Sequence, residues 1–362
     1  MTRPFHALGN ILSSTLIFTF AFTLGCGDSS APAPTPNIAA PAKTNDSAST
    51  TADAAAKPVD ATSPTAELEK VQLQLNWFPE AEHGGFYTAD INGYYRDAGL
   101  EVTILPGGPN AAMIQKVAGE QVEFAVASAD QVLTGRAQDA AVVAVFAPLQ
   151  MSPRCILVHE SSGIKSLEEL KGVTLAMSAG AAFAQYMQKK LPLTDVQVVP
   201  YPGNVTQFLL DKNYAQQGYV FSEPFVAKKE GGDPVSLMVS DLGFNPYTSI
   251  LITNEKTIKE KPELVRKVVA AVTKGWQDYL EKPEATNALI NKINPEMGLD
   301  VLEFGVEALK PLCITAEVDL SKMGAMTAER WNDLAAQLVE AEVIEPDSVK
   351  PEEAFTTEFL PN

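Results

Sequence analysis

Arginine, histidine and cysteine are scarce in this 362-residue chain, and their scarcity excludes several functions. Six arginines are spread singly along the sequence, and acidic residues outnumber basic ones by 45 to 27, for a formal net charge of -18. Nucleic acids and anionic membrane surfaces are bound through basic patches, so neither is an expected partner. Three histidines and three cysteines, all far apart, do not have the spacing of a structural zinc site. We therefore expect no metal, no cofactor and no nucleic acid.

Strongly apolar sequence is confined to a short run near the start of the chain. That run, Ile11 to Gly25, follows the positive charge of Arg3 and is too short to cross a bilayer as a helix. It ends in Thr23-Leu24-Gly25-Cys26, which resembles a bacterial lipoprotein signal except that leucine usually stands at the position of Thr23. The resemblance predicts that residues 1–26 are a signal, that Cys26 carries lipid, and that the protein is exported to the periplasm or cell surface, held at a membrane by the lipid anchor only. The alternative is ordinary secretion with a coincidental cysteine, which exports the protein as well.

Residues 27–68 contain no aromatic side chain and consist mainly of Ala, Pro, Ser, Thr and Asp. Such a composition cannot bury enough apolar surface to offset the entropy that is lost on ordering. We expect a disordered tether that holds the following domain near the membrane and leaves it free to move. A low-complexity tail without that role is the alternative, but the position directly after Cys26 favours a tether.

From residue 69 onward, short β-rich runs alternate with helical stretches. This alternation is typical of a mostly parallel sheet that is covered by helices on both faces. The runs that have the composition of buried strands are Val71–Leu75, Glu101–Leu105, Val122–Ala127, Ala141–Phe146, Val173–Met177, Val196–Pro200, Gly218–Phe221 and Val235–Val239. A break near residues 150–160 indicates two sheets rather than one.

Two further runs lie where the chain changes over between the sheets. Cys155–His159 and Thr248–Thr253 are placed to form two strands that connect the lobes. The predicted fold class is α/β, a clamshell of two α/β lobes joined by two crossing strands. We assign residues 69–157 to the first part of lobe I, residues 158–246 to lobe II, and residues 247–362 to the return strand and C-terminal helices of lobe I.

The last third of the chain is predicted to be helical. Pro262 suits the first turn of a helix. The apolar residues that recur every four positions after it are Leu264, Val268, Val272, Trp276 and Leu280. Further helices are expected at Leu302–Leu309 and Thr327–Leu338. We interpret these apolar stripes as core packing rather than as a cofactor site.

Residues 75–87 form the most informative of the loops that follow a predicted strand. Ligands of open α/β sheets bind beyond the carboxyl ends of the strands, and in a two-lobed protein these ends face one another across a cleft that a hinge can close. The loop has the sequence LNWFPEAEHGGFY, in which aromatic rings, an amide and a histidine surround a glycine pair. Such side chains can stack on a flat polar ligand and form hydrogen bonds with it.

This loop resembles the first motif of periplasmic solute-binding proteins of the thiamine-precursor (pyrimidine) and sulfonate type, LxWxPxxxHxxxYxA. The matching residues are Asn76-Trp77, Pro79, His83, Tyr87 and Ala89. The resemblance continues through Val122-Glu123-Phe124, Leu167 to Val173, Gly218-Tyr219-Val220 with Glu223-Pro224, and Asn254 to Ala270, and covers roughly residues 70–300.

The resemblance implies a type II periplasmic-binding fold, a small-molecule ligand and delivery of that ligand to the permease of an ABC importer. It places Asn76, Trp77, His83 and Tyr87 among the ligand-binding residues. From the residues alone, a place in the core of a lobe is the alternative for Trp77 and Phe78, and for His83 a helix cap is the more common role.

Four polar or small residues at helix starts are further candidates. Ser128 and Gln131 begin a helix after the third predicted strand, and Ser178 and Gly180 do so in lobe II. Free backbone N–H groups at such positions can hold a carbonyl or an anion. Simple helix capping is the alternative for both pairs.

Polar side chains also follow the next two strands of lobe II. Tyr201 and Asn204 come after one of them, and Tyr219 and Glu223 after the other. A carboxylate such as Glu223 in a closed cleft would accept a hydrogen bond from an amino group or a ring N–H. Its alternative role is to cap the following helix.

An enzyme of the same fold is the main alternative to a receptor without chemistry. One branch of the resembling family, hydroxymethylpyrimidine phosphate synthase, uses a pyridoxal-phosphate lysine and, four residues away, a histidine just after the third strand. Ala127 and Gln131 occupy those places here, and the cysteine-rich motif of that branch is missing because Cys155 and Cys313 stand alone. Without the lysine no Schiff base can form, so we expect no enzymatic activity. A sensor ectodomain is a weaker alternative, because it would need a transmembrane helix that we do not find.

The chemistry of these loops favours a neutral or weakly basic heteroaromatic ligand, such as a thiamine-type aminopyrimidine or a flavin-like molecule. Sulfonate or nitrate would need a cationic or amide cradle, and only Arg154 lies near the expected hinge. We expect a monomer. Ligand identity stays open, as does a disulfide between Cys155 and Cys313 in an oxidising compartment.

Overall fold

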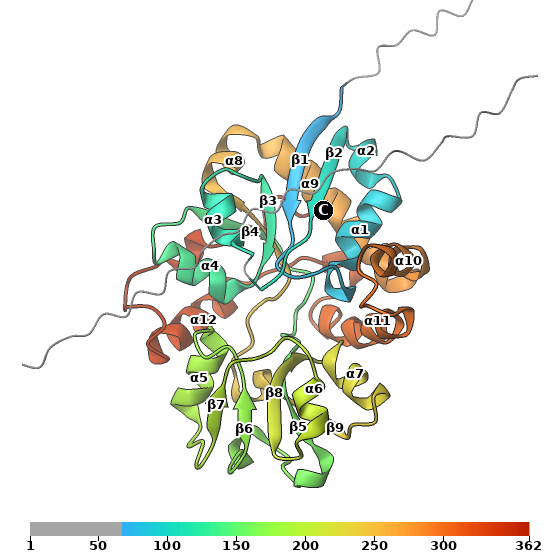
Figure 1. Ribbon diagram of the computed structural model, residues 1–362. Helices are drawn as coiled ribbons and strands as arrows, with labels where there is room; N and C mark the ends of the chain where they lie inside the picture. The colour runs from blue at the N-terminus through green and yellow to red at the C-terminus, as the bar shows by residue number, and fades with distance from the viewer. Residues whose placement is uncertain (1–66, 110, 362) are drawn as a thin grey trace, which may run out of the picture. The chain divides into compact units, whose positions relative to one another are not determined.

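The computed structural model describes residues 67–109 and 111–361. The predicted signal, Cys26 and all of the predicted tether except its last two residues therefore lie outside the described residues. The described chain contains two separate five-stranded sheets, each flanked by helices (Figure 1). None of the described helices has the length and the apolar composition needed to cross a membrane.

The first sheet has the strand order β2-β1-β3-β10-β4. Its strands are β1 (Glu69–Gln74), β2 (Leu100–Leu105), β3 (Phe124–Ala127), β4 (Val142–Phe146) and β10 (Ile250–Asn254). β1 pairs in parallel with β2 and β3, whereas β10 pairs antiparallel with β3 and β4. Every residue of β3 and β4 is buried, which explains why both are continuous apolar runs rather than alternating ones.

The second sheet repeats this arrangement with the order β7-β6-β8-β5-β9. Its strands are β5 (Arg154–His159), β6 (Thr174–Ala176), β7 (Gln197–Val199), β8 (Tyr214–Tyr219) and β9 (Pro234–Met238). β6 pairs in parallel with β7 and β8, and β5 is antiparallel to β8 and β9. Each sheet is therefore mixed, with a single antiparallel strand that lies second from one edge.

The connections between the sheets differ from the expected ones. The runs predicted to cross, Cys155–His159 and Thr248–Thr253, form most of β5 and β10, which lie inside the second and the first sheet, respectively. The chain crosses in the segments just before them, residues 147–153 and 243–249, which pair through Leu149 and Thr248. The expected lobe boundary after residue 157 therefore falls within β5. Fully buried apolar runs are favoured in sheet interiors, while the prolines of both connecting segments disfavour regular strand pairing there.

One strand is also shifted from its predicted position. We expected a strand at Gly218–Phe221, whereas β8 begins at Tyr214 and ends at Tyr219. Gln216 and Gln217 lie in the buried part of this strand, and two glutamines conceal its apolar character in the sequence. Because the strand includes these two glutamines, it ends at Tyr219, a residue that the prediction placed inside the strand.

The helices connect the strands and cover the sheets. They are the short 3-10 turn η1 (Ala81–His83), α1 (Gly84–Ile91), α2 (Tyr94–Asp97), α3 (Met113–Ala118), α4 (Ala129–Arg136), α5 (Ala182–Lys190), α6 (Thr206–Leu210), α7 (Glu223–Lys229), α8 (Glu255–Glu260), α9 (Pro262–Glu281), α10 (Glu284–Ile293), α11 (Leu299–Cys313) and α12 (Ala328–Glu340). The predicted helices at residues 262–280, 302–309 and 327–338 correspond to α9, α11 and α12.

Helix α9 packs closely against α1 in the core of the first lobe. All five residues of its predicted apolar stripe are buried, including Trp276 and Leu280. Glycines permit the close approach, because a Cβ atom on Gly85 would lie 2.2 Å from the indole ring of Trp276, and one on Gly275 would lie 2.2 Å from the carbonyl oxygen of Gly85. This contact fixes the direction in which the chain leaves the loop after β1.

Helices α11 and α12 each contact helical elements of both lobes (Figure 1). α11 packs against η1 of the first lobe and against α7 of the second, where Phe304 stacks on Phe225 at 4.8 Å and Asp300 pairs with Lys229 at 2.7 Å. α12 packs against α4 and α5, and its Trp331 belongs to a core cluster that extends from β3 to β6. The C-terminal helices thus tie the two lobes together on either side of the crossing segments.

Candidate functional site

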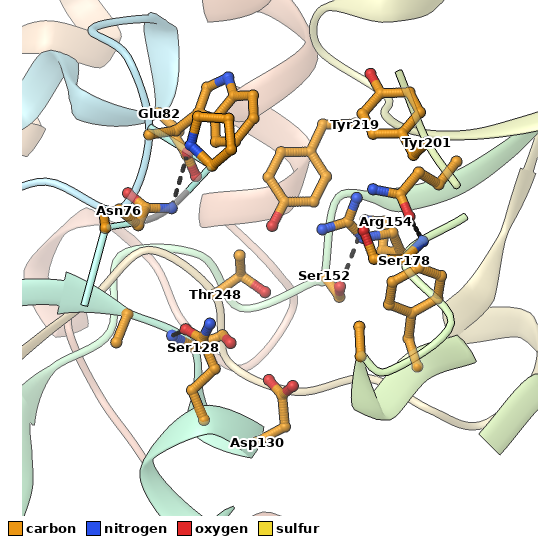
Figure 2. A pocket seen from close by; sticks show the side chains of 18 of the residues that line it. Asn76, Glu82, Ser128, Asp130, Ser152, Arg154, Ser178, Tyr201, Tyr219 and Thr248 are labelled. Atoms are coloured by element: carbon orange, nitrogen blue, oxygen red, sulfur yellow. Dashed lines mark hydrogen bonds between the residues drawn. The ribbon is translucent and has the colours of Figure 1, made fainter. Parts of the chain in front are cut away.

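A cavity of about 450 Å³ lies between the two sheets. Its lining comes from the loops that follow β1, β2, β3, β6 and β7, from the end of β8, and from both crossing segments. Figure 2 shows side chains that face one another across it, with Asn76 and Ser128 on one side and Arg154 and Ser178 on the other. The carboxyl ends of the parallel strands therefore meet at this cavity, as the strand alternation predicts for an α/β protein.

The loop after β1 forms one wall through a chain of buried hydrogen bonds. Glu82 accepts from Asn76 Nδ2 at 3.1 Å and from the hydroxyl of Ser249, in the second crossing segment, at 2.5 Å. Asn76 Oδ1 in turn lies 2.7 Å from His83 Nε2, while Nδ1 of His83 accepts from the backbone N–H of Glu80 at 3.3 Å. This places the ring proton of His83 on Nε2, and burial lowers the pKa of His83 to about 3, so the ring is neutral.

Glu80 and Glu82 are two buried carboxyl groups in this wall. They are 5% and 0% exposed and both line the cavity. Burial, together with the charges of Glu82 and Glu223, raises the pKa of Glu80 well above its ordinary value. Burial also raises the pKa of Glu82, although its hydrogen bonds from Ser249 and Asn76 oppose this. The first wall thus holds a carboxyl pair rather than an ion pair.

Helix α4 brings Ser128, Asp130 and Gln131 to the same side of the cavity. Gln131 Oε1 accepts from the backbone N–H of Ser128 at 3.1 Å, and the Ser128 side chain bonds back to the backbone of Gln131 in a capping box. Burial raises the pKa of Asp130, and hydrogen bonds from Ser128 and the charge of Arg154 oppose this. Residues at this helix start therefore serve both as caps and as cavity lining.

Arg154 is the basic residue of the second wall. It begins β5, and its guanidinium lies 4.1 Å from the ring centroid of Tyr219 and 4.7 Å from that of Phe183. A guanidinium over aromatic faces gains cation–π attraction. Among the described residues, the guanidinium has no carboxylate within ion-pair distance.

Glu223, the first residue of α7, supplies a carboxylate to the second wall. It accepts from the Tyr201 hydroxyl at 2.8 Å and from the backbone N–H of Tyr219 at 2.8 Å. Burial and the charge of Glu223 raise the pKa of Tyr201, which keeps that hydroxyl a hydrogen-bond donor. Each carboxylate oxygen has a second acceptor position, so Glu223 retains capacity for a donor group in the cavity.

Eight of the residues predicted from the sequence meet at this cavity. They are Asn76, Trp77, Ser128, Gln131, Ser178, Tyr201, Tyr219 and Glu223. They lie at or beyond the carboxyl ends of five strands from both lobes. Ser178 is fixed there by its backbone N–H, which donates to Gln217 at 2.7 Å. Their roles as ligand contacts stay predictions.

Four predicted residues lie outside the lining, and each has a local reason. His83 is fully buried behind Asn76, and Tyr87 is packed in the core of the first lobe, where burial raises its pKa to about 12. Gly180 is exposed, and its carbonyl accepts from Gln185 at 3.1 Å. Asn204 is exposed and accepts from the backbone N–H of Thr206 at the start of α6.

Several lining residues were not among the predicted site residues. The charged ones are Glu80, Glu82, Asp130 and Arg154, and Phe183, Gln217 and Phe244 also contribute. Glu80 and Glu82 lie within the loop of residues 75–87. The sequence signal for them was the presence of two charged residues among apolar ones. Arg154 gave a weaker signal as the lone arginine near the crossing point, and Phe183 and Phe244 gave none that separates them from core residues.

The donors of the lining limit the chemistry that it can perform. The described residues that line the cavity include no lysine, histidine or cysteine. Cys155 and Cys313 are free and buried in different core clusters, and burial raises the pKa of both thiols. The cavity thus offers hydrogen-bond acceptors, one guanidinium and aromatic faces, which are the groups of a binding site.

Comparison with known proteins identifies the family of this chain. Residues 80–286, more than half of the chain, match the family described as NMT1/THI5 like. The chain belongs to the NMT1/THI5-like family. The predicted kinship with solute-binding proteins of the pyrimidine and sulfonate type is confirmed by individual relatives.

Two relatives of this NMT1/THI5-like protein are named as binding proteins. The riboflavin-binding protein RibY of Chloroflexus aurantiacus is 27% identical over 330 residues, which cover 87% of this chain and 93% of RibY. The formylaminopyrimidine-binding protein of Halalkalibacterium halodurans is 26% identical over 307 residues, 80% of this chain and 90% of the relative. A third relative is named as an enzyme, the 4-amino-5-hydroxymethyl-2-methylpyrimidine phosphate synthase of Candida albicans, at 24% identity over 249 residues, 64% of this chain and 74% of the synthase.

A solved structure establishes the fold class. The periplasmic aliphatic sulphonate-binding protein SsuA of Escherichia coli aligns with a TM-score of 0.60 at 16% identity, covering 79% of this chain and 91% of SsuA. The NMT1/THI5-like chain therefore has the periplasmic-binding-protein fold, and the predicted two-lobed α/β class is confirmed.

Proposed function

We propose that this NMT1/THI5-like protein is an extracytoplasmic solute-binding protein that captures a neutral or weakly basic heteroaromatic solute and delivers it to an ABC importer. The observation that carries the proposal is the cavity between the lobes, which combines aromatic faces with hydrogen-bond acceptors from both walls. A ligand that contacts both Trp77 on one wall and Glu223 on the other stabilises the arrangement of the lobes in which both contacts form. A permease can recognise that arrangement.

The charge of the lining supports a ligand that is not an anion. Glu80, Glu82, Asp130 and Glu223 supply carboxyl groups, whereas Arg154 supplies the single basic side chain of the described lining. A sulfonate or nitrate would stand close to several carboxyl groups with one guanidinium to balance them, which is electrostatically unfavourable. Amino groups and ring N–H donors find acceptors throughout the cavity.

The names of the relatives point to the same ligand class. RibY is named for riboflavin, and the relative from Halalkalibacterium halodurans is named for a formylaminopyrimidine. Both of these ligands contain a nitrogen heterocycle. Since relatives of one fold differ in ligand, the family relationship supports a heteroaromatic solute without choosing between the two. An aminopyrimidine and a flavin are therefore the ligands to test.

The synthase relatives favour an enzyme as the second candidate function. As the resemblance implies, the synthase branch of the family uses a lysine four residues before a histidine. Ala127 and Gln131 stand at those two places here, and both line the cavity. Schiff-base formation requires an amine, which the described lining does not supply. We therefore favour the receptor over the synthase.

The remaining parts of the proposal concern where the protein acts. Residues 1–26 are proposed to be a lipoprotein signal that is cleaved just before Cys26, and Cys26 is proposed to hold the mature protein at a membrane through lipid. Residues 27–68 are proposed to act as a tether, and the protein to act as a monomer.

A thermal-shift screen of the purified full chain tests the proposed function. We expect riboflavin or 4-amino-5-hydroxymethyl-2-methylpyrimidine to raise the unfolding temperature in a concentration-dependent way, because a ligand that binds only the folded state stabilises it. Alkanesulfonates and nitrate should give no shift. A shift with the anions alone would contradict the proposed ligand class, and pyrimidine synthesis above blank with pyridoxal phosphate would contradict the receptor.

A further inference from the structure

We propose that Glu80 and Glu82 share one proton and act together as a donor and an acceptor, which select a ligand ring whose edge carries an acceptor beside an N–H donor. Such an edge occurs in the amidine unit of an aminopyrimidine and in the imide unit of a flavin. The inference rests on the proposed function for the ligand part, whereas the sharing of the proton is a property of the empty protein.

The two carboxyl groups are placed for this role by their surroundings. Both line the cavity, and both are almost completely withdrawn from solvent. Glu82 is held by Asn76 at 3.1 Å and by Ser249 at 2.5 Å, so its orientation is fixed from the loop after β1 and from the crossing segment. Glu80 precedes the same short turn two residues earlier, and after burial the charge of Glu82 is the largest cause that raises the pKa of Glu80. One proton on either carboxyl group removes this repulsion between them.

No described cation balances a second negative charge at this pair. His83 lies 3.6 Å from Glu82, but its Nε2 proton is committed to Asn76 and the ring is neutral. Arg154 acts on the pair across the cavity and is not within ion-pair distance of it. Two carboxylates that share a site without a cation cannot both ionise at moderate cost.

Other titratable groups facing the pair do not change this balance. From the elements packed around it they are Glu223 of α7, Arg154 of β5, Tyr201 after β7, Tyr219 of β8, Tyr279 of α9 and Asp130 of α4. The tyrosines are neutral, since burial raises the pKa of each of them. The carboxyl groups outnumber the single guanidinium, so their combined field favours retention of the proton at the pair.

A shared proton makes the pair complementary to one kind of ring edge. The protonated group donates a hydrogen bond, and the ionised group accepts one, so an adjacent acceptor and donor on the ligand satisfy both. A ligand edge with two acceptors leaves the ionised carboxylate without a donor, and an anionic group places a second negative charge beside it. Either ligand should therefore bind more weakly. The pair therefore acts as a specificity element in addition to the aromatic and Glu223 contacts.

The proton is tested first in the empty protein, by unfolding in urea across pH. A carboxyl group whose folded-state pKa is raised contributes stability that is fully present below its unfolded pKa and is lost as the pH rises toward the folded pKa. Replacing Glu80 by glutamine keeps the shape and removes the titration. Relative to the wild type, Glu80→Gln should therefore gain folding stability as the pH rises from about 4.5, by up to about tenfold in the folding equilibrium constant per pH unit.

Two further variants make the unfolding result decisive. Glu101→Gln changes the same charge at an exposed position of β2, and its stability relative to the wild type should not follow this pH dependence. Glu82→Gln keeps an oxygen acceptor for Ser249 and should show the same trend as Glu80→Gln if the latter folds poorly. Equal pH dependence in the wild type, Glu80→Gln and Glu82→Gln would overturn the shared proton.

The ligand part is tested by fluorescence titration of the full chain with riboflavin, whose imide edge does not titrate between pH 5 and pH 9. Once the pair loses its proton, the wild-type Kd should rise with pH, by up to about tenfold per unit. The Kd of Glu80→Gln should stay constant, because its amide both donates and accepts at every pH. Riboflavin methylated at the imide nitrogen should bind at least about tenfold more weakly, since the donor is lost.

The outcomes separate this inference from the proposed function. Tight riboflavin binding with the same pH profile in the wild type and Glu80→Gln, or unchanged binding of the methylated ligand, would overturn recognition of the ring edge while the receptor function stands. A chain that binds neither riboflavin nor the aminopyrimidine contradicts the proposed function, and recognition of the edge is overturned with it. The unfolding experiment decides the shared proton in either case.

Discussion

At the scale of single residues, Trp77 and Glu223 represent the two walls of the cavity. Trp77 follows β1 and is half-buried, with its ring edge-on to Phe78 at 5.5 Å. Glu223 begins α7 and is held by Tyr201 and Tyr219. Neither side chain belongs to a core cluster, so each is available to a ligand at little cost to the fold.

Replacing either residue should weaken binding without unfolding the protein. Loss of a stacking ring in Trp77→Ala, or of a charged acceptor in Glu223→Gln, should each cost about 1–3 kcal/mol of binding free energy, roughly a tenfold to hundredfold rise in Kd. Isothermal titration calorimetry with the solute found in the thermal-shift screen measures this. Leu210→Ala is the control, because Leu210 is an apolar residue at the end of α6 that is 76% exposed and does not line the cavity.

A different pattern would place the binding site elsewhere. If both variants bind normally, the cavity between the sheets is not where the solute lies. If instead both lose several kcal/mol of stability in the empty state, the two residues act as core or cap. Sequence reasoning alone could not separate these roles, since a tryptophan after a strand suits a core as well as a cleft.

The predicted residues that line the cavity are those whose position follows directly from the end of a strand. Asn76 and Trp77 follow β1 directly, and any residue at that position of a parallel strand points toward the carboxyl edge of the sheet. His83 and Tyr87 are one helical turn or more further along, where the close approach of α1 to α9 turns them into the core. That approach depends on glycines whose partners lie in a distant helix, which the local pattern does not reveal.

At the scale of elements, the contact between α1 and α9 is the one most sensitive to a single methyl group. A Cβ atom on Gly85 would lie 2.2 Å from the ring of Trp276, a large side chain that is fully buried and has little space to move. The helices would have to separate, and α1 carries the loop after β1 with it.

Gly85→Ala should therefore destabilise the folded protein. Overpacking of a filled core costs about 1–3 kcal/mol, occasionally more, and here it also disturbs the wall formed by Asn76 and Glu82. Urea unfolding monitored by tryptophan fluorescence should show a lower midpoint. Gly180→Ala is the control, because its Cβ meets nothing within 4 Å, and its midpoint should remain that of the wild type.

Most elements were predictable because hydrophobic runs and helix starts are local. The strands with uninterrupted apolar residues, such as β3 and β4, lie close to where the sequence placed them. β8 does not, because Gln216 and Gln217 are buried in a strand whose sequence reads as polar. Which strand pairs with which, and that β5 and β10 are the antiparallel members, depends on contacts across the sheets and could not be obtained from composition.

At the scale of the whole molecule, the surroundings of Arg154 could not be obtained from the sequence. Arg154 reaches the cavity because the first crossing segment leads to it, and its aromatic partners come from two other elements of the second lobe, Phe183 from α5 and Tyr219 from the end of β8. Arg154, Phe183 and Tyr219 come together only when the chain folds, so no local motif predicts their contact.

The membrane anchor is a prediction for the complete chain, since Cys26 lies outside the described residues. Cys26→Ala should move the protein from the membrane pellet to the supernatant after cell fractionation, because the thiol that carries the lipid is lost. Cys155→Ala removes a different thiol and should leave the protein with the membrane. Unchanged retention of Cys26→Ala would refute lipidation at this residue.

The place of β10 in the first sheet also determines when that sheet can be completed during synthesis. β10 lies between β3 and β4, yet the ribosome makes it only after every strand of the second sheet. Domains usually fold as units in the order in which they emerge, but this chain cannot finish its first lobe until the second has been translated. The first sheet therefore stays in two parts, β2-β1-β3 and β4, until β10 has been translated and joins them. This delay leaves an interval in which the proposed export can begin before the first lobe is complete.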